Sequence, residues 1–157
     1  MRISALTGAC VLAISLAVLA AGLYYDQAHV YEWTRFAASS NLTKGPVEAQ
    51  TAKIFTLVGA IASAFGASVA AGGALLARLG GRTGVWVLRL TSVLLLVLML
   101  LVAVVLVVGS LTGEDPVAII ETPGWLLTAE WGALLLAVVG AGISVADLWR
   151  FVPAQEE

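Results

Sequence analysis

Charged residues are scarce in this chain, and they are absent from the middle of its apolar segments. Only 11% of the 157 residues are charged, against about 25% in an ordinary globular domain. Four segments contain no charged residue: 3–25, 54–77, 90–113 and 131–146. An α-helix needs about 20 apolar residues to cross a hydrocarbon core of about 30 Å. The first three segments reach that length, and the fourth reaches it with its flanking Trp residues. The sequence therefore predicts an all-α integral membrane protein with four transmembrane helices.

Cysteine and histidine each occur once, which excludes several kinds of site. Cys10 cannot form an internal disulfide, and the sole histidine, His29, excludes bis-histidine haem ligation within the chain. Asp26, His29 and Glu32 fall at i, i+3 and i+6, a spacing that can contact a metal ion. Such residues at an exposed helix end are more often solvated, and solvation is what we expect here. No phosphate-binding loop, nucleophile–base pair or zinc-ligand spacing is present. The sequence thus favours a protein that is not an enzyme and has no cofactor or resident metal.

The overall composition leaves room for little besides the membrane segments. The chain is 61% hydrophobic, and its net charge of −2 argues against a nucleic-acid partner. The first apolar segment continues to Tyr25, which is longer than the apolar region of a signal peptide, so we expect it to remain as an anchor. We predict one domain over residues 1–157, an antiparallel up-down bundle. Its expected helices cover about residues 3–38, 46–78, 84–110 and 124–151.

The distribution of basic residues predicts the orientation. Arg78, Arg82 and Arg89 lie between the second and third segments with no acid among them, so this connection is expected to be cytoplasmic and both termini with it. On the outer side, Pro46 is a suitable helix start. We expect the first two helices to project about 15–20 Å beyond the membrane, with an irregular interfacial loop as the alternative. Six arginines against two lysines, with abundant Ala, Val, Leu and Gly, favour a GC-rich bacterial genome and hence a bacterial inner membrane.

Small residues predict which helix faces pack closely, because transmembrane helices associate where their backbones can approach. The third helix is almost entirely Leu and Val over residues 93–108, so we expect it to face lipid broadly or to meet a partner through large side chains. The second helix has two small-residue faces, more than one neighbour requires, which favours a partner chain. The expected packing residues are Ala9, Ala13 and Ala17 in a stripe from Ala5 to Ala21, Gly59, Ser63 and Gly66 on the second helix, and Ala137 and Gly140 on the fourth.

Two acids bracket the shortest apolar segment. Glu130 and Asp147 enclose 16 residues, about 24 Å of helix against a core of about 30 Å. At least one carboxylate should therefore reach the hydrocarbon edge, where it could serve as an entry site for protons or cations. The alternative, which we favour, is ion pairing: Asp147 with Arg150 or Arg89 at the inner edge, and Glu130 with Lys53 or water at the outer edge.

These features favour a structural role. We expect a non-catalytic accessory subunit of a larger membrane complex, such as a respiratory or other energy-converting assembly. Its partners would be other integral membrane subunits and lipid, with no small-molecule substrate evident. The alternative is a small homo-oligomeric transporter or channel that uses Glu130 as its coupling acid.

Overall fold

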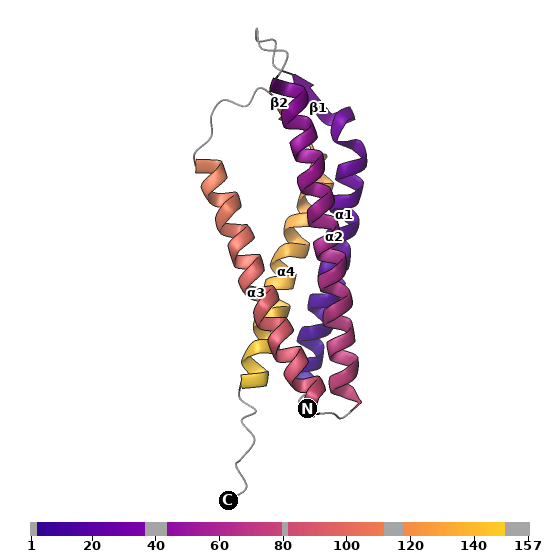
Figure 1. Cartoon of the computed structure of the whole chain (residues 1–157), viewed down its shortest axis with the longest axis vertical. Helices are drawn as coiled ribbons and strands as arrows, with labels where there is room; N and C mark the ends of the chain where they lie inside the picture. The colour runs from indigo at the N-terminus through magenta and orange to yellow at the C-terminus, as the bar shows by residue number, and fades with distance from the viewer. Residues whose placement is uncertain (1–2, 37–43, 80–81, 112–117, 150–157) are drawn as a thin grey trace, which may run out of the picture.

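The computed structural model describes residues 3–36, 44–79, 82–111 and 118–149. Over these residues the chain forms four long helices and two short strands. In Figure 1 the helices lie along the long axis and alternate in direction. The elements, in chain order, are α1 (Ile3–Trp33), β1 (Thr34–Phe36), α2 (Lys44–Arg78), α3 (Arg82–Leu111), β2 (Ala118–Ile120) and α4 (Gly124–Trp149).

Within the described residues, three helices are long and apolar enough to cross a membrane. They are Ala5–Trp33 of α1, Pro46–Arg78 of α2 and Gly124–Asp147 of α4. In α3 the comparable stretch, Gly84–Leu98, is shorter. The helical architecture and the membrane character agree with the sequence prediction at this level.

The buried face of α1 differs from the alanine stripe that the sequence suggested. Ala9 is fully buried, but Ala13 is only partly buried and Ala17 is exposed. The physical reason is the helical repeat: each step of four residues rotates about 40° beyond one turn, so a stripe at i+4 winds around the helix. The face that packs follows a seven-residue repeat instead, with Leu12 and Leu16 at its centre.

A close backbone contact joins α1 and α4. A Cβ atom on Gly140 would lie 2.8 Å from both the Gly8 carbonyl oxygen and the Leu12 nitrogen, so the two backbones touch here. Beside them the Ser144 hydroxyl donates a hydrogen bond to the Ala5 carbonyl at 3.3 Å. Ala137 is also fully buried, in the same cluster as Leu12. Contact of this kind is how helices associate in lipid.

The small residues of α2 serve two neighbours within the chain. A Cβ on Gly66 would meet Leu95 of α3 at 3.1 Å and Leu16 of α1 at 3.2 Å, while one on Gly59 would meet Leu23 of α1 at 3.0 Å. Ser63 is buried on the same side. Gly59, Ser63 and Gly66 thus pack against neighbours within the chain.

A two-stranded ribbon lies where α1 ends and α4 begins. β1 and β2 pair antiparallel, with Arg35 opposite Ile119. The expectation that the first helix continues to about residue 38 is wrong, because the chain turns into β1 after Trp33. The helix can end there since its last carbonyls find partners: the Thr34 hydroxyl donates to the Val30 carbonyl, and the Glu121 amide donates to the Trp33 carbonyl at 3.1 Å.

Candidate functional site

Asp26 is a buried acid on the packing face of α1. Its side chain is only 8% exposed. Seven-residue steps from Ala5 lead through Leu12 and Leu19 to Asp26, so the carboxylate occupies a position that a core residue holds in the turns below. The helix therefore directs this acid toward its neighbours.

Glu130 lies across the interface, in the second turn of α4. A Cβ atom on Gly22 of α1 would meet Glu130 Cγ at 3.0 Å and Oε1 at 3.2 Å. Glycine at this position therefore leaves the space in which the Glu130 side chain lies. Asp26 is one helical turn beyond Gly22, and the two carboxyl groups are close enough to interact electrostatically.

The ribbon supplies the polar neighbour of this acid pair. Thr122 follows β2, and its hydroxyl donates a hydrogen bond to the Asp26 carboxylate. Pro123 then begins α4 by accepting hydrogen bonds from the amides of Leu126 and Leu127 at 2.9 and 3.1 Å. Asp26 Oδ1 and Glu130 Oε1 remain buried with no hydrogen-bond partner among the described residues. Because buried carboxylate oxygens are normally satisfied, these two oxygens mark a place where a proton, a cation or water fits.

The other predicted edge charges lie elsewhere. Lys53 does not meet Glu130; its Nζ lies 5.0 Å from the ring centroid of Tyr31, which ties α2 to α1. The guanidinium of Arg89 lies 5.4 Å from the Trp86 ring centroid near the start of α3. Asp147 is partly buried near the end of α4. Of its two expected partners, Arg150 and Arg89, the first is outside the described residues.

An aromatic cluster covers the outer side of α1 next to the acid pair. The His29 ring stacks between Tyr25 and Trp33, at centroid distances of 4.2 and 5.4 Å, and Trp125 of α4 lies 5.9 Å from Tyr25. The His29 Nδ1–H donates to the Tyr25 carbonyl at 2.8 Å. His29 thus packs with aromatic rings while Asp26 turns inward, so solvation of all three residues, Asp26, His29 and Glu32, is the wrong expectation. Among the described residues, no three His, Cys, Asp or Glu side chains converge on one point.

The interior below the acid pair is apolar. A pocket of about 140 Å³ lies between the four helices. Its lining includes Leu23, which follows Gly22 on α1, and Leu134, which is one turn after Glu130 on α4. Ser63 is the one polar residue among the described side chains that line it. The carboxylates therefore sit at the top of an apolar core.

The sequence identifies Glu130 but does not point to Asp26 or Thr122. The charge of Asp26 suggests a solvated helix end, although continuing the seven-residue repeat of α1 places it on the packing face. Thr122 carries no comparable signal, because its position depends on a ribbon between segments that are far apart in the sequence.

The chain was compared with protein-family models, curated proteins and solved structures. None of the three comparisons found a match. Its function is therefore inferred from the residues and the geometry described above.

Proposed function

We propose that this chain is a non-catalytic accessory subunit of a larger membrane complex. The observation that carries the proposal is the divergence of α3 from the other helices. In Figure 1 the first half of α3 lies against the bundle and its second half stands away from α2 and α4. In its first half Leu88 and Ser92 are fully buried while Leu90 and Leu94 are exposed. Leu98 and Leu100, farther along the helix, are about half exposed.

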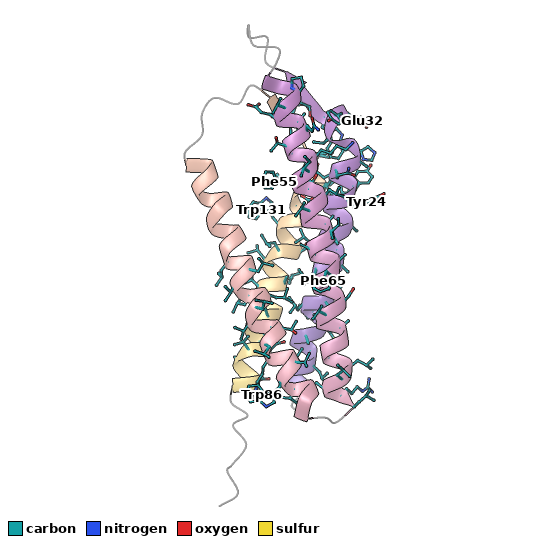
Figure 2. All side chains as sticks on the ribbon, viewed as in Figure 1. Tyr24, Glu32, Phe55, Phe65, Trp86 and Trp131 are labelled. Atoms are coloured by element: carbon teal, nitrogen blue, oxygen red, sulfur yellow. The ribbon has the colours of Figure 1, made fainter. Side chains whose placement is uncertain are left out.

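Large aromatic side chains lie on the faces that the second half of α3 leaves uncovered. Figure 2 shows Phe55 of α2 and Trp131 of α4 on the side of the molecule where α3 stands apart, with Tyr24 and Glu32 on the opposite side. Phe55 is 72% exposed and Trp131 is 47% exposed. A transmembrane helix of a partner seated between α3 and these residues would cover both.

The length of α1 and α2 takes their outer ends beyond the hydrocarbon core. With 31 and 35 residues they extend about 46 and 52 Å, against a hydrocarbon core of about 30 Å and a bilayer with headgroups of about 40–45 Å. The excess length ends in the ribbon and the aromatic cluster, where headgroups, water or another protein can make contact. In this proposal all four helices span a bacterial inner membrane with cytoplasmic termini, and the complex is a respiratory or other energy-converting assembly.

Site-specific photo-crosslinking in native membranes tests this proposal. A benzophenone amino acid at Phe55 should crosslink to a distinct, larger membrane subunit, which should also co-purify stoichiometrically in mild detergent. The same probe at Val18, which is exposed on α1, is the matched control and should give a weaker protein adduct. A clean monomer with no adduct from Phe55 would refute the proposal.

The acid pair favours a second candidate, a small homo-oligomeric transporter or channel. Asp26 and Glu130 bring two carboxylates with unsatisfied oxygens together at one end of the bundle, and intramembrane acids often mark proton or cation pathways. The apolar pocket below them weighs against a continuous polar path through one chain. Transport would therefore need a pathway formed between copies.

Reconstituted vesicles separate the two candidates. If Glu130 is the coupling acid, proton-driven flux should be lost in Glu130→Gln and kept in Glu32→Gln, which changes an exposed acid on α1. Flux that survives Glu130→Gln would exclude this mechanism, and no flux above empty vesicles would exclude transport by the chain alone.

A further inference from the structure

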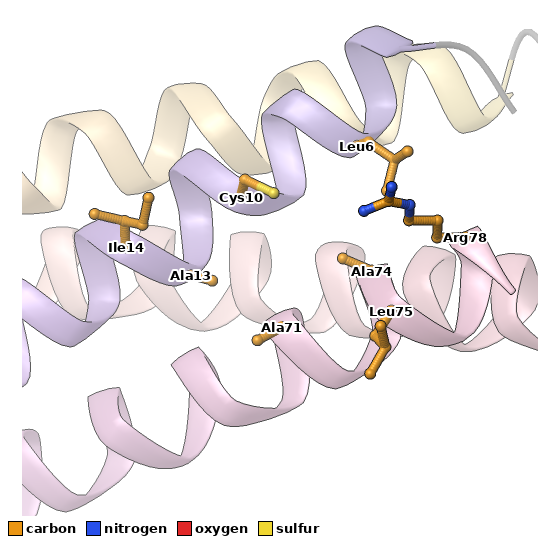
Figure 3. Close-up of a pocket in the computed structure, with 8 residues that line it drawn as sticks. All are labelled: Leu6, Cys10, Ala13, Ile14, Ala71, Ala74, Leu75 and Arg78. Atoms are coloured by element: carbon orange, nitrogen blue, oxygen red, sulfur yellow. The ribbon is translucent and has the colours of Figure 1, made fainter.

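A separate groove lies between α1 and α2, near the start of α1 and the end of α2. Its volume is about 440 Å³, within the range of ligand pockets. Its lining includes the small side chains of Cys10, Ala13 and Ala71, here called the small-residue floor, and the larger side chains of Leu6 and Leu75. Figure 3 shows these residues on the neighbouring turns of α1 and α2. The groove is far along the helices from Asp26 and Glu130.

One end of this apolar groove carries a positive charge. Arg78 is the one charged residue among the described side chains that line it. Its side chain extends from α2 toward Leu6 on α1, so the guanidinium lies at the mouth of the groove (Figure 3). Arg78 is exposed and is also the last residue of the apolar stretch of α2. The lining of the groove therefore changes from apolar side chains to the Arg78 guanidinium at the end of the apolar stretch of α2.

We propose that this groove binds one anionic phospholipid, with an acyl chain on the small-residue floor and the phosphate on Arg78. From Leu6 to Ile14 the groove follows eight residue steps along α1, about 12 Å. This length is close to half of the hydrocarbon core of about 30 Å, the depth of a single leaflet. Basic pockets at the ends of transmembrane helices bind anionic headgroups, and a guanidinium pairs with phosphate through two hydrogen bonds.

The polarity of the lining favours a phospholipid over a partner helix. The groove is apolar along α1 and α2 and carries one exposed guanidinium at its end. A phospholipid presents a hydrocarbon chain followed by an anionic headgroup, which matches this change from apolar to cationic lining.

Native mass spectrometry of the full chain in mild detergent tests this proposal. After delipidation, phosphatidylglycerol should be retained in preference to phosphatidylcholine of the same chain length. Arg78→Gln should reduce that preference about fivefold, the equivalent of the ~1 kcal/mol that one basic residue contributes at an anionic membrane surface. Arg78→Lys retains the charge and should retain most of the preference. Ala71→Trp fills the floor and should weaken the binding of both lipids.

The single cysteine provides a second readout without any substitution. Cys10 is exposed in the groove, so bound lipid should slow its reaction with a maleimide in phosphatidylglycerol nanodiscs relative to phosphatidylcholine nanodiscs. Arg78→Gln should abolish the difference in rate. An unchanged lipid preference in Arg78→Gln, or equal Cys10 rates in the two lipids, would overturn the proposal.

Discussion

At the scale of single residues, Asp26 and Glu130 place two like charges in one helix interface. Glu130→Gln removes a charge and introduces an amide that can donate a hydrogen bond to Asp26. We expect it to stabilise the chain by about 1 kcal/mol at pH 8, the typical contribution of a hydrogen bond that satisfies a buried group. Thermal unfolding in detergent measures this effect. Glu32→Gln is the matched control and should change the free energy of unfolding by less than about 0.5 kcal/mol. A lower unfolding temperature for Glu130→Gln than for this control would contradict the prediction.

The acid pair also shows how far single residues could be predicted from the sequence. Glu130 was identifiable because it bounds an apolar segment that is too short for the membrane. Asp26 was harder to identify, because its charge suggested an exposed helix end, whereas the repeat of α1 buries it. Lys53 had a plausible partner in Glu130, but its placement over Tyr31 depends on the rotation of α2 against α1, which the sequence does not specify.

At the scale of elements, the Glu121 amide joins the ribbon to the end of α1. Glu121→Pro removes the N–H that bonds the Trp33 carbonyl, whereas Glu121→Ala removes the carboxylate and keeps the N–H. We expect faster hydrogen–deuterium exchange over residues 30–36 in Glu121→Pro than in Glu121→Ala, because the last turn of α1 loses a cap. Equal exchange in the two variants would show that the ribbon does not hold this helix end.

The contact between α1 and α4 gives a second prediction at this scale. Gly140→Ala places a methyl group 2.8 Å from the Gly8 carbonyl oxygen, so the helices must separate. We expect a loss of about 1–3 kcal/mol, the usual cost of overpacking. Gly142→Ala is the control on the same helix, because a Cβ there meets no atom within 4 Å. Unfolding of both variants in detergent compares them, and an equal loss would contradict the described interface.

The helices were predictable from the sequence and the ribbon was not, for one physical reason. Each helix follows a continuous apolar segment, and its backbone hydrogen bonds are local, so composition and length suffice. The ribbon pairs residues 34–36 with residues 118–120. These short segments become strands only when α1 and α4 pack together, and no local pattern reports that packing. The rotation of the alanine stripe was missed for a related reason, since i+4 spacing only approximates the helical repeat.

At the scale of the whole molecule, the placement of α3 decides how the bundle relates to its surroundings. Residues 93–108 of this helix are almost entirely Leu and Val, which by itself predicts a membrane span. In the structure its first half belongs to the bundle and its second half does not. Lipid and a partner helix can both cover such a surface, and the proposed accessory role depends on which of them does so.

The orientation of the whole molecule is tested most directly on α2. Val47 and Leu79 are both exposed at opposite ends of this helix, separated by about 48 Å, which exceeds the 40–45 Å of a bilayer with its headgroups. In a Cys10→Ala background, Val47→Cys should react with an impermeant maleimide in intact bacterial cells, whereas Leu79→Cys should react only after permeabilisation. The reason for this expectation is the positive-inside rule, which favours a cytoplasmic location for the arginines near Leu79. Labelling of both positions in intact cells would show that α2 does not span the membrane. The opposite pattern would leave α2 spanning but would place the arginine-rich connection outside, contrary to the predicted cytoplasmic termini.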